Sequence, residues 1–155
     1  MEGVDRAVFP VGAGIAAGGL ELRCVIFAHH RGRLVLIHHR KDPVYGDAWT
    51  LPGDVLEYGV HPRLCATRTL KEQVGEAPKT IRLLGVRSGT DGEWVLTFEF
   101  EAQLADEATL RKGTHEARTE AVDAGLPEDL HPSSRSELEM YKVLRLVKAG
   151  HAASK

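Results

Sequence analysis

The sequence lacks three features that would each have placed the protein in a special class. It has only two cysteines, Cys24 and Cys65, whose spacing matches no metal motif, so we expect buried free thiols, as in a reducing cytosol. No apolar run reaches the ~18 residues that a membrane helix needs, and the first residues carry acid where a secretion signal needs positive charge. The net charge is only −2, with both signs interspersed, so nothing indicates a nucleic-acid binder. We therefore expect a cytoplasmic protein without membrane or nucleic-acid partners.

The length of 155 residues suits one ordinary domain and is too short for two. Residues 1–19 are expected to be an N-terminal lead-in segment, because the stretch from Ala7 is rich in glycine and small residues and is broken by Pro10. Gly12 to Gly18 superficially resemble a dinucleotide fingerprint, but no convincing strand precedes them and no convincing helix follows. The domain itself is expected at residues 20–150.

Hydrophobic patterns predict the elements of this domain. The expected strands are Leu20–Ala28 and Leu34–Ile37, which form a hairpin around Arg31-Gly32-Arg33, a short extended stretch at Trp49–Gly53, and then Ile81–Val86 and Trp94–Phe100. A final helix is expected from about Ser136 to Val147, preceded by capping-box spacing at Ser134–Glu137. Residues 102–124 are polar and give no clear assignment. The order of elements predicts an α/β fold: a mixed sheet covered by helices on both faces.

One helix is predicted with particular clarity, from Arg63 to Val74. Pro62 stands where a first helical residue tolerates proline, and Gly75 stands where a helix ends. An apolar stripe runs along it at every fourth residue, at Ala66, Leu70 and Val74.

The residues around this helix resemble a known motif. Leu51-Pro52-Gly53-Asp54-Val55-Leu56-Glu57-Tyr58-Gly59 leads into a helix that ends Arg68-Thr69-Leu70-Lys71-Glu72-Gln73-Val74-Gly75. The segment 53–76 resembles the Nudix box, G-x5-E-x7-R-E-U-x-E-E-x-G-U, in which U is a bulky aliphatic residue. The preceding Trp49-x-Leu51-Pro52-Gly53 resembles the lead-in of that family. The chain is thus similar to the Nudix (MutT-like) hydrolases, and the resemblance implies an α/β/α sandwich.

The match to the box is incomplete. The arginine and the glycine are kept as Arg68 and Gly75, the middle aliphatic residue is kept as Leu70, and one glutamate is kept as Glu72. The other positions differ: the first glycine falls on Asp54, three glutamates fall on Val60, Thr69 and Gln73, and the last aliphatic position holds Glu76. Since the glutamate at the position of Val60 helps to orient the box arginine in the family, Arg68 must find another partner, such as Glu72 one turn later.

In an intact box, positions 69, 72 and 73 share one helical face, and their carboxylates hold Mg2+ or Mn2+ against a diphosphate. The metal polarises the phosphoryl group and activates the attacking water. The resemblance offers the Gly53 carbonyl as a further ligand. Here two of the three carboxylates are missing, so we expect Mg2+ or Mn2+ to bind weakly or not at all.

A weaker metal cluster can be rebuilt from other acids. Asp54 stands beside the expected metal, Glu57 follows three residues later, and Glu116 lies where the family often returns a late glutamate to the site. With Glu72, these residues and Gly53 form the candidate metal set, and Glu72 and Glu116 are the candidate catalytic residues. The alternative stays open: Asp54 as a turn residue, Glu57 paired with Arg68, and Glu116 solvated.

Several residues near the motif are candidates for contacts with a substrate. His39 and Arg40, at the end of the second strand, can contact a phosphate, and Tyr45 on the following loop can stack on a base. Trp49 is expected in the core. The doublets at 29–30 and 38–39 do not predict zinc, because neighbouring side chains on a strand point to opposite faces.

Two functions remain open at this point. The first is a divergent Nudix-type hydrolase that cleaves the phosphoanhydride of a small nucleoside-diphosphate-like substrate with a divalent metal. The second is a Nudix-fold protein without pyrophosphohydrolase activity, which binds a ligand or performs altered chemistry. The partner is in either case a small, phosphorylated molecule, and a homodimer is left open.

Overall fold

The computed structural model describes residues 19–90, 94–112, 115–120 and 126–153. The expected lead-in therefore lies almost wholly outside the described residues. The strands are β1 (Leu20–His30), β2 (Arg33–His38), β3 (Trp49–Thr50), β4 (Gly53–Val55), β5 (Thr80–Thr90), β6 (Trp94–Gln103) and β7 (Ala117–Glu120). The helices are α2 (Pro62–Thr69), continued by the π-helical turn η1 (Leu70–Val74), and α3 (Pro132–Ala153).

The described strands form one mixed sheet in the order β3-β2-β1-β6-β5, with β4 paired to β1 and β7 paired to β2. The central strands β1 and β6 run parallel, and the other pairs are antiparallel. Along its edge β1 has two successive partners: it pairs with β4 near its start, at Arg23–Val25, and with β2 at its end, at His29–His30. The box segment is thereby tied directly to the central strand.

The predicted hairpin of β1 and β2 is confirmed. Its turn places Arg31 at φ 54° and Gly32 at φ 76°, which are the positive angles that a tight two-residue hairpin requires. β2 is buried from Leu34 to Ile37, as expected for a strand covered on both faces.

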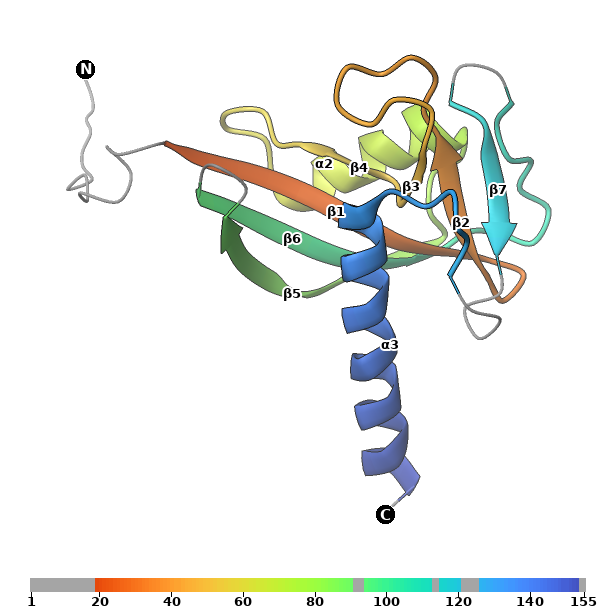
Figure 1. Cartoon of the computed structure of the whole chain (residues 1–155). Coiled ribbons are helices and arrows are strands. Elements are labelled where there is room, and N and C mark those ends of the chain that lie inside the picture. Colours follow the sequence, from red (N-terminus) through yellow and green to blue (C-terminus); the bar gives the residue numbers. More distant parts are fainter. Residues whose placement is uncertain (1–18, 91–93, 113–114, 121–125, 154–155) are drawn as a thin grey trace.

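Two hydrophobic cores lie on opposite faces of the sheet, and Figure 1 shows α2 and α3 on either side of it. The alternation of β1 divides its side chains between them: Ile26 packs toward α2, with Ala66, and Phe27 packs toward α3, with Leu138. The predicted α/β/α arrangement is thus confirmed. Figure 1 also shows that α3 begins against the sheet and then extends away from it.

The box helix has the predicted limits but an unpredicted second half. His61 caps its start by accepting a hydrogen bond from the Arg63 N–H at 3.1 Å, and Pro62 is the first helical residue. From Leu70 the helix becomes a π turn, in which the Gly75 N–H donates to the Leu70 carbonyl at 3.0 Å. Gly75 ends the helix at φ 97°, an angle that favours glycine.

The last helix differs from its prediction. It begins at Pro132, four residues before the expected Ser136, and the predicted capping box is wrong. The Ser134 hydroxyl accepts a hydrogen bond from the Leu51 N–H at 3.0 Å, and Glu137 pairs with Arg87. His131 serves as the cap, because its ring nitrogen accepts from the Ser133 N–H at 3.2 Å. The two side chains that the local pattern assigned to capping therefore bind other segments: Ser134 binds the residue after β3, and Glu137 binds β5.

β7 lies in the segment that the sequence left without assignment, and it pairs with β2. β5 continues to Thr90, four residues beyond the expected Val86, and residues 91–93 before β6 lie outside the described part of the chain. In the part of the chain that the structure describes, no helix combines the length and the apolar character needed to cross a bilayer.

Candidate active site

A large cleft of about 850 Å³ lies beside the box segment. Its lining includes Gly53, Asp54, Glu72 and Gln73, called here the box wall, together with residues of β1, β5 and β6, of the loop after β2 and of the start of α3. This volume is within the roughly 300–1,000 Å³ typical of small-molecule sites. The box therefore faces a space that can hold a nucleotide-sized ligand.

Gly53 is glycine because β4 runs very close to β1 at this point. A Cβ atom added to Gly53 would lie 2.7 Å from the backbone oxygen of Cys24, closer than real Cβ contacts. The absence of a side chain lets the Gly53 turn pack directly on the central strand. This contact fixes where the Gly53 backbone groups meet the box helix.

The side chain of Gln73, on the box helix, binds the backbone N–H and carbonyl of Gly53. The Gly53 N–H donates to Gln73 Oε1 at 3.1 Å, and Gln73 Nε2 donates to the Gly53 carbonyl at 2.9 Å. An amide satisfies both backbone groups at once because it has one acceptor and one donor end. The carbonyl expected as a metal ligand is thus already bound to a hydrogen-bond donor.

Thr69 does not share a face with Glu72 and Gln73, contrary to the expectation from helical spacing. It is only 2% exposed, and its hydroxyl lies 3.9 Å from the Cys24 thiol. The π turn that follows Thr69 is the reason, because its i→i+5 bonds rotate later side chains relative to a regular helix. Thr69 points into the core, while Glu72 and Gln73 line the cleft.

Cys24 and Cys65 are free, buried thiols, as predicted. Their sulfur atoms lie 3.5 Å apart. The hydrogen bond with Cys65, together with burial, raises the pKa of Cys24, and the same contact lowers the pKa of Cys65. The two thiols therefore form a direct contact between β1 and the box helix.

The predicted acids are only partly brought together. Asp54 and Glu72 are exposed and line the cleft. Glu57 is exposed but is not among the residues that line the cleft, and Glu116 forms an ion pair with Arg40 at 3.3 Å. Across the described ranges, His, Cys, Asp and Glu form no group of three or more that could hold a metal ion.

A divalent cation can nevertheless bind to these residues if water and substrate phosphates supply its other ligands. Mg2+ often binds through one or two carboxylates and completes its shell with water and substrate phosphates. Asp54 and Glu72 offer two such carboxylates on one cleft. The residues fit an ion that shares its ligands with a diphosphate, and they do not fit the family's full carboxylate cluster.

The rest of the lining includes aromatic and histidine side chains. Tyr45 lies between His39 and His131, with ring centroids 4.6 and 5.1 Å away. The His39 ring nitrogen Nε2 bonds the Thr50 hydroxyl at 2.8 Å. Burial lowers the pKa of His39, and Asp42 opposes this effect. Of the predicted substrate contacts, His39 and Tyr45 line the cleft, whereas Arg40 is not among the lining residues.

Sequence reasoning missed several other residues of this lining. His115 and His131 line the cleft together with Ser134 and Glu137 at the start of α3. No local pattern marks them, since they reach the cleft only through the docking of the segment before β7 and of α3. Trp49 packs against the core on the α3 face, as expected, with His38 stacked on it at 4.7 Å.

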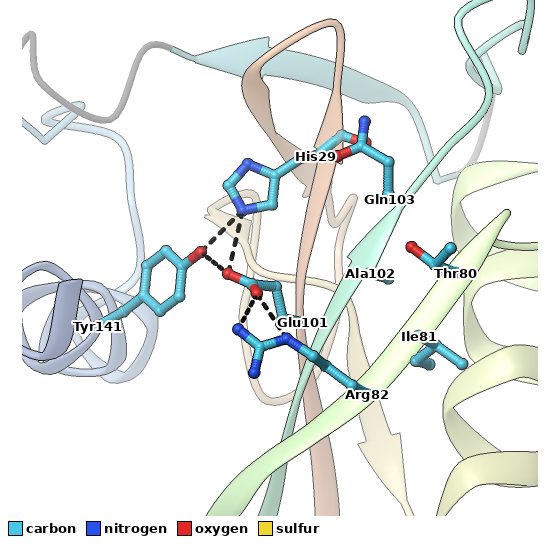
Figure 2. Close-up of a pocket in the computed structure, with 8 residues that line it drawn as sticks. All are labelled: His29, Thr80, Ile81, Arg82, Glu101, Ala102, Gln103 and Tyr141. Carbon is cyan, nitrogen blue, oxygen red and sulfur yellow. Dashed lines mark hydrogen bonds and ion pairs between the residues drawn. The ribbon is translucent and has the colours of Figure 1, made fainter. Parts of the chain in front are cut away.

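The docking of α3 depends on a second polar cluster, shown in Figure 2. The Tyr141 hydroxyl donates to Glu101 and contacts His29 at 2.8 Å, while Arg82 binds the other oxygen of Glu101 at 2.6 Å. These side chains come from β1, β5, β6 and α3, and they border a smaller cavity of about 320 Å³. The cluster holds α3, and hence one wall of the large cleft, in position.

Fold and cleft together define a class: an α/β/α domain whose large cleft lies beside a glycine turn and the end of the helix that carries Glu72. The NUDIX domain family model matches residues 21–146, and the chain belongs to this family. Solved structures that share this fold include proteins that are named as hydrolases or as a diphosphatase. Comparison with curated protein sequences gave no match.

Solved structures share the fold. A MutT NUDIX hydrolase from Burkholderia pseudomallei is 25% identical, with a TM-score of 0.64 over 77% of this chain and 96% of its own. The MutT protein from Methanosarcina mazei Go1 is 14% identical, with a TM-score of 0.69 over 81% and 95%. The NUDIX domain of Shewanella oneidensis NrtR, solved with ADP ribose, is 20% identical, with a TM-score of 0.59 over 82% and 87%.

Proposed function

We propose that the protein is a divergent Nudix hydrolase that cleaves the phosphoanhydride of a small nucleoside-diphosphate-like substrate. The observation that carries this proposal is the cleft of about 850 Å³, whose lining includes Gly53, Asp54 and Glu72 together with Tyr45 and His39. It offers carboxylates and a histidine for the phosphate end of a substrate and the Tyr45 ring for its base end. The ADP ribose bound by the NrtR domain is a ligand of this kind.

In this proposal Asp54 and Glu72 would hold a Mg2+ or Mn2+ ion that also binds the diphosphate. When bound, such an ion polarises the phosphoryl group and lowers the pKa of water. The protein's own residues position the substrate: Tyr45 packs against the base, and His39 and His115 line the phosphate path. Glu116 follows His115 in the sequence and acts here as the ion-pair partner of Arg40.

A panel of nucleotide sugars, dinucleotides and nucleoside triphosphates tests the proposal. We expect slow hydrolysis that depends on the divalent ion and is faster with manganese, which tolerates mixed ligand sets. Glu72→Gln should lose this activity, whereas Glu139→Gln, at an exposed helical site away from the cleft, should keep it. Fast turnover with magnesium alone would contradict the expected effect of the missing carboxylates, and equal activity of the two variants would contradict the assignment of Glu72.

One observation favours a second candidate, a ligand-binding module without turnover. The substitutions at Thr69 and Gln73 fall on the family's acids, and both side chains have neutral partners in the structure. Calorimetry with ADP ribose separates the candidates. Binding without any product, in wild type with manganese present, supports the module.

A further inference from the structure

The paired hydrogen bonds between Gln73 and Gly53 carry an inference about the metal site itself. The Gly53 backbone presents one N–H and one carbonyl to the helix, and the Gln73 amide satisfies both at 3.1 and 2.9 Å. The side chain is half-buried, and its position is held by the close approach of Gly53 to β1. This contact is a built link between β4 and the box helix.

A glutamate at position 73 would behave differently at the same place. One carboxylate oxygen would accept from the Gly53 N–H, but the other would face the Gly53 carbonyl oxygen without a proton between them. Two such oxygens repel each other unless a cation lies between them. The residue at position 73 therefore decides whether this point of the cleft requires an ion or is complete without one.

We infer that Gln73 replaces a resident divalent cation at Gly53: its amide closes the turn, and an ion enters the cleft only together with the phosphates of a ligand. This inference rests on the proposed function only for the identity of the cleft as the ligand site. Two further features agree with it. Thr69 brings no oxygen to the cleft because it is buried against Cys24, and Asp54 and Glu72 alone remain as carboxylates on the box wall.

Thermal unfolding in EDTA and in millimolar manganese tests the inference without measuring turnover. We expect the wild-type melting temperature to be the same in both conditions. Gln73→Glu should melt several degrees lower in EDTA, because one hydrogen bond is replaced by a repulsion, and manganese should restore it. Gln73→Leu should be lowered equally in both conditions.

Gln103→Glu is the matched control, because it makes the same chemical change at a glutamine that also bonds backbone carbonyls, at 3.4 and 3.3 Å. Its melting temperature should not respond to manganese. The inference is overturned if manganese stabilises the wild type as much as Gln73→Glu, or if Gln73→Glu does not respond at all.

A titration of the wild type keeps the inference testable if Gln73→Glu does not fold. Free manganese, followed by its electron paramagnetic resonance signal, should bind weakly to the protein alone and at least ten-fold more tightly when α,β-methylene-ADP is present. Tight binding of manganese alone would overturn the inference. If only the proposed function fails, manganese should still bind weakly alone and more tightly with α,β-methylene-ADP, but no hydrolysis should be detected.

Discussion

The Thr69 hydroxyl and the Cys24 thiol lie 3.9 Å apart inside the core that β1 shares with the box helix. Thr69 stands where the related motif carries a glutamate, yet its side chain points away from the cleft. Cys24 is held in the neutral state, because its hydrogen bond with Cys65 and its burial raise its pKa. A carboxylate at position 69 would therefore enter an apolar region, and restoring the motif there would not by itself restore a metal ligand.

Thr69→Glu is accordingly expected to destabilise the protein. Burying a carboxylate without a partner should cost about 3–5 kcal/mol. Thr67→Glu, at a half-buried position on the same helix, should cost much less. Urea unfolding of both variants measures the difference, and equal stabilities would show that Thr69 is accessible to solvent in the native state.

Gly53→Ala should strain the contact between β4 and β1. The new Cβ would lie 2.7 Å from the backbone oxygen of Cys24, and relieving this overlap should cost about 1–3 kcal/mol. Gly85→Ala is the control, since no atom lies within 4 Å of a Cβ built there. If both alanine variants melt at the wild-type temperature, the close approach at Gly53 is not a constraint.

Tyr141→Phe should weaken the docking of α3. Burial raises the pKa of Glu101, but hydrogen bonds from Tyr141 and Arg82 outweigh it, so the pKa is lowered from its ordinary 4.5. The network therefore stabilises the folded protein at pH values above 4.5, and this stabilisation is lost as the pH falls through the lowered pKa of Glu101. Near neutral pH the variant should lose about 1.5–3 kcal/mol, as for a hydrogen bond to a charged group. The loss should shrink in acid.

Tyr58→Phe provides the control for this prediction, because Tyr58 is fully exposed. It should follow the wild-type stability curve at every pH. A deficit of Tyr141→Phe that stays constant from neutral pH down to pH ~3, well below the reference pKa of a glutamate, would mean that the hydroxyl does not act through the Glu101 carboxylate.

His39→Gln should change the pH dependence of stability near neutrality. Burial lowers the pKa of His39 from its ordinary 6.5, and the nearby His38, His115 and His131 act in the same direction against Asp42. The unfolded chain therefore takes up a proton more readily than the folded protein, and stability falls as the pH drops through 6.5. Glutamine can keep a hydrogen bond to Thr50 without titrating, so the variant should lose less stability between neutral pH and pH ~5, where an unperturbed histidine becomes charged. If the melting temperatures of wild type and His39→Gln change equally with pH, the lowered pKa of His39 does not contribute to this pH dependence.

The sequence by itself determined the limits of the box helix and the two faces of the sheet. Pro62 and Gly75 mark helix ends through backbone angles that each residue type favours, and the stripe of Ala66, Leu70 and Val74 is buried as predicted. The same is true of β1 and β2, whose apolar runs predict burial. These features depend on the period of side chains along one segment, and that period can be read locally.

Only the tertiary structure decided which side chains form the site. The π turn after Thr69 changed the face on which each box residue lies, and it cannot be read from a regular helical period. The Gln73 amide forms hydrogen bonds of 2.9 and 3.1 Å with the backbone of Gly53, which lies 20 residues earlier in the sequence. His131 reached Tyr45 because α3 begins earlier than its own sequence pattern indicated. Such contacts depend on how separate segments pack on the sheet, and the pattern within one segment carries no information about the partner that packing brings to it.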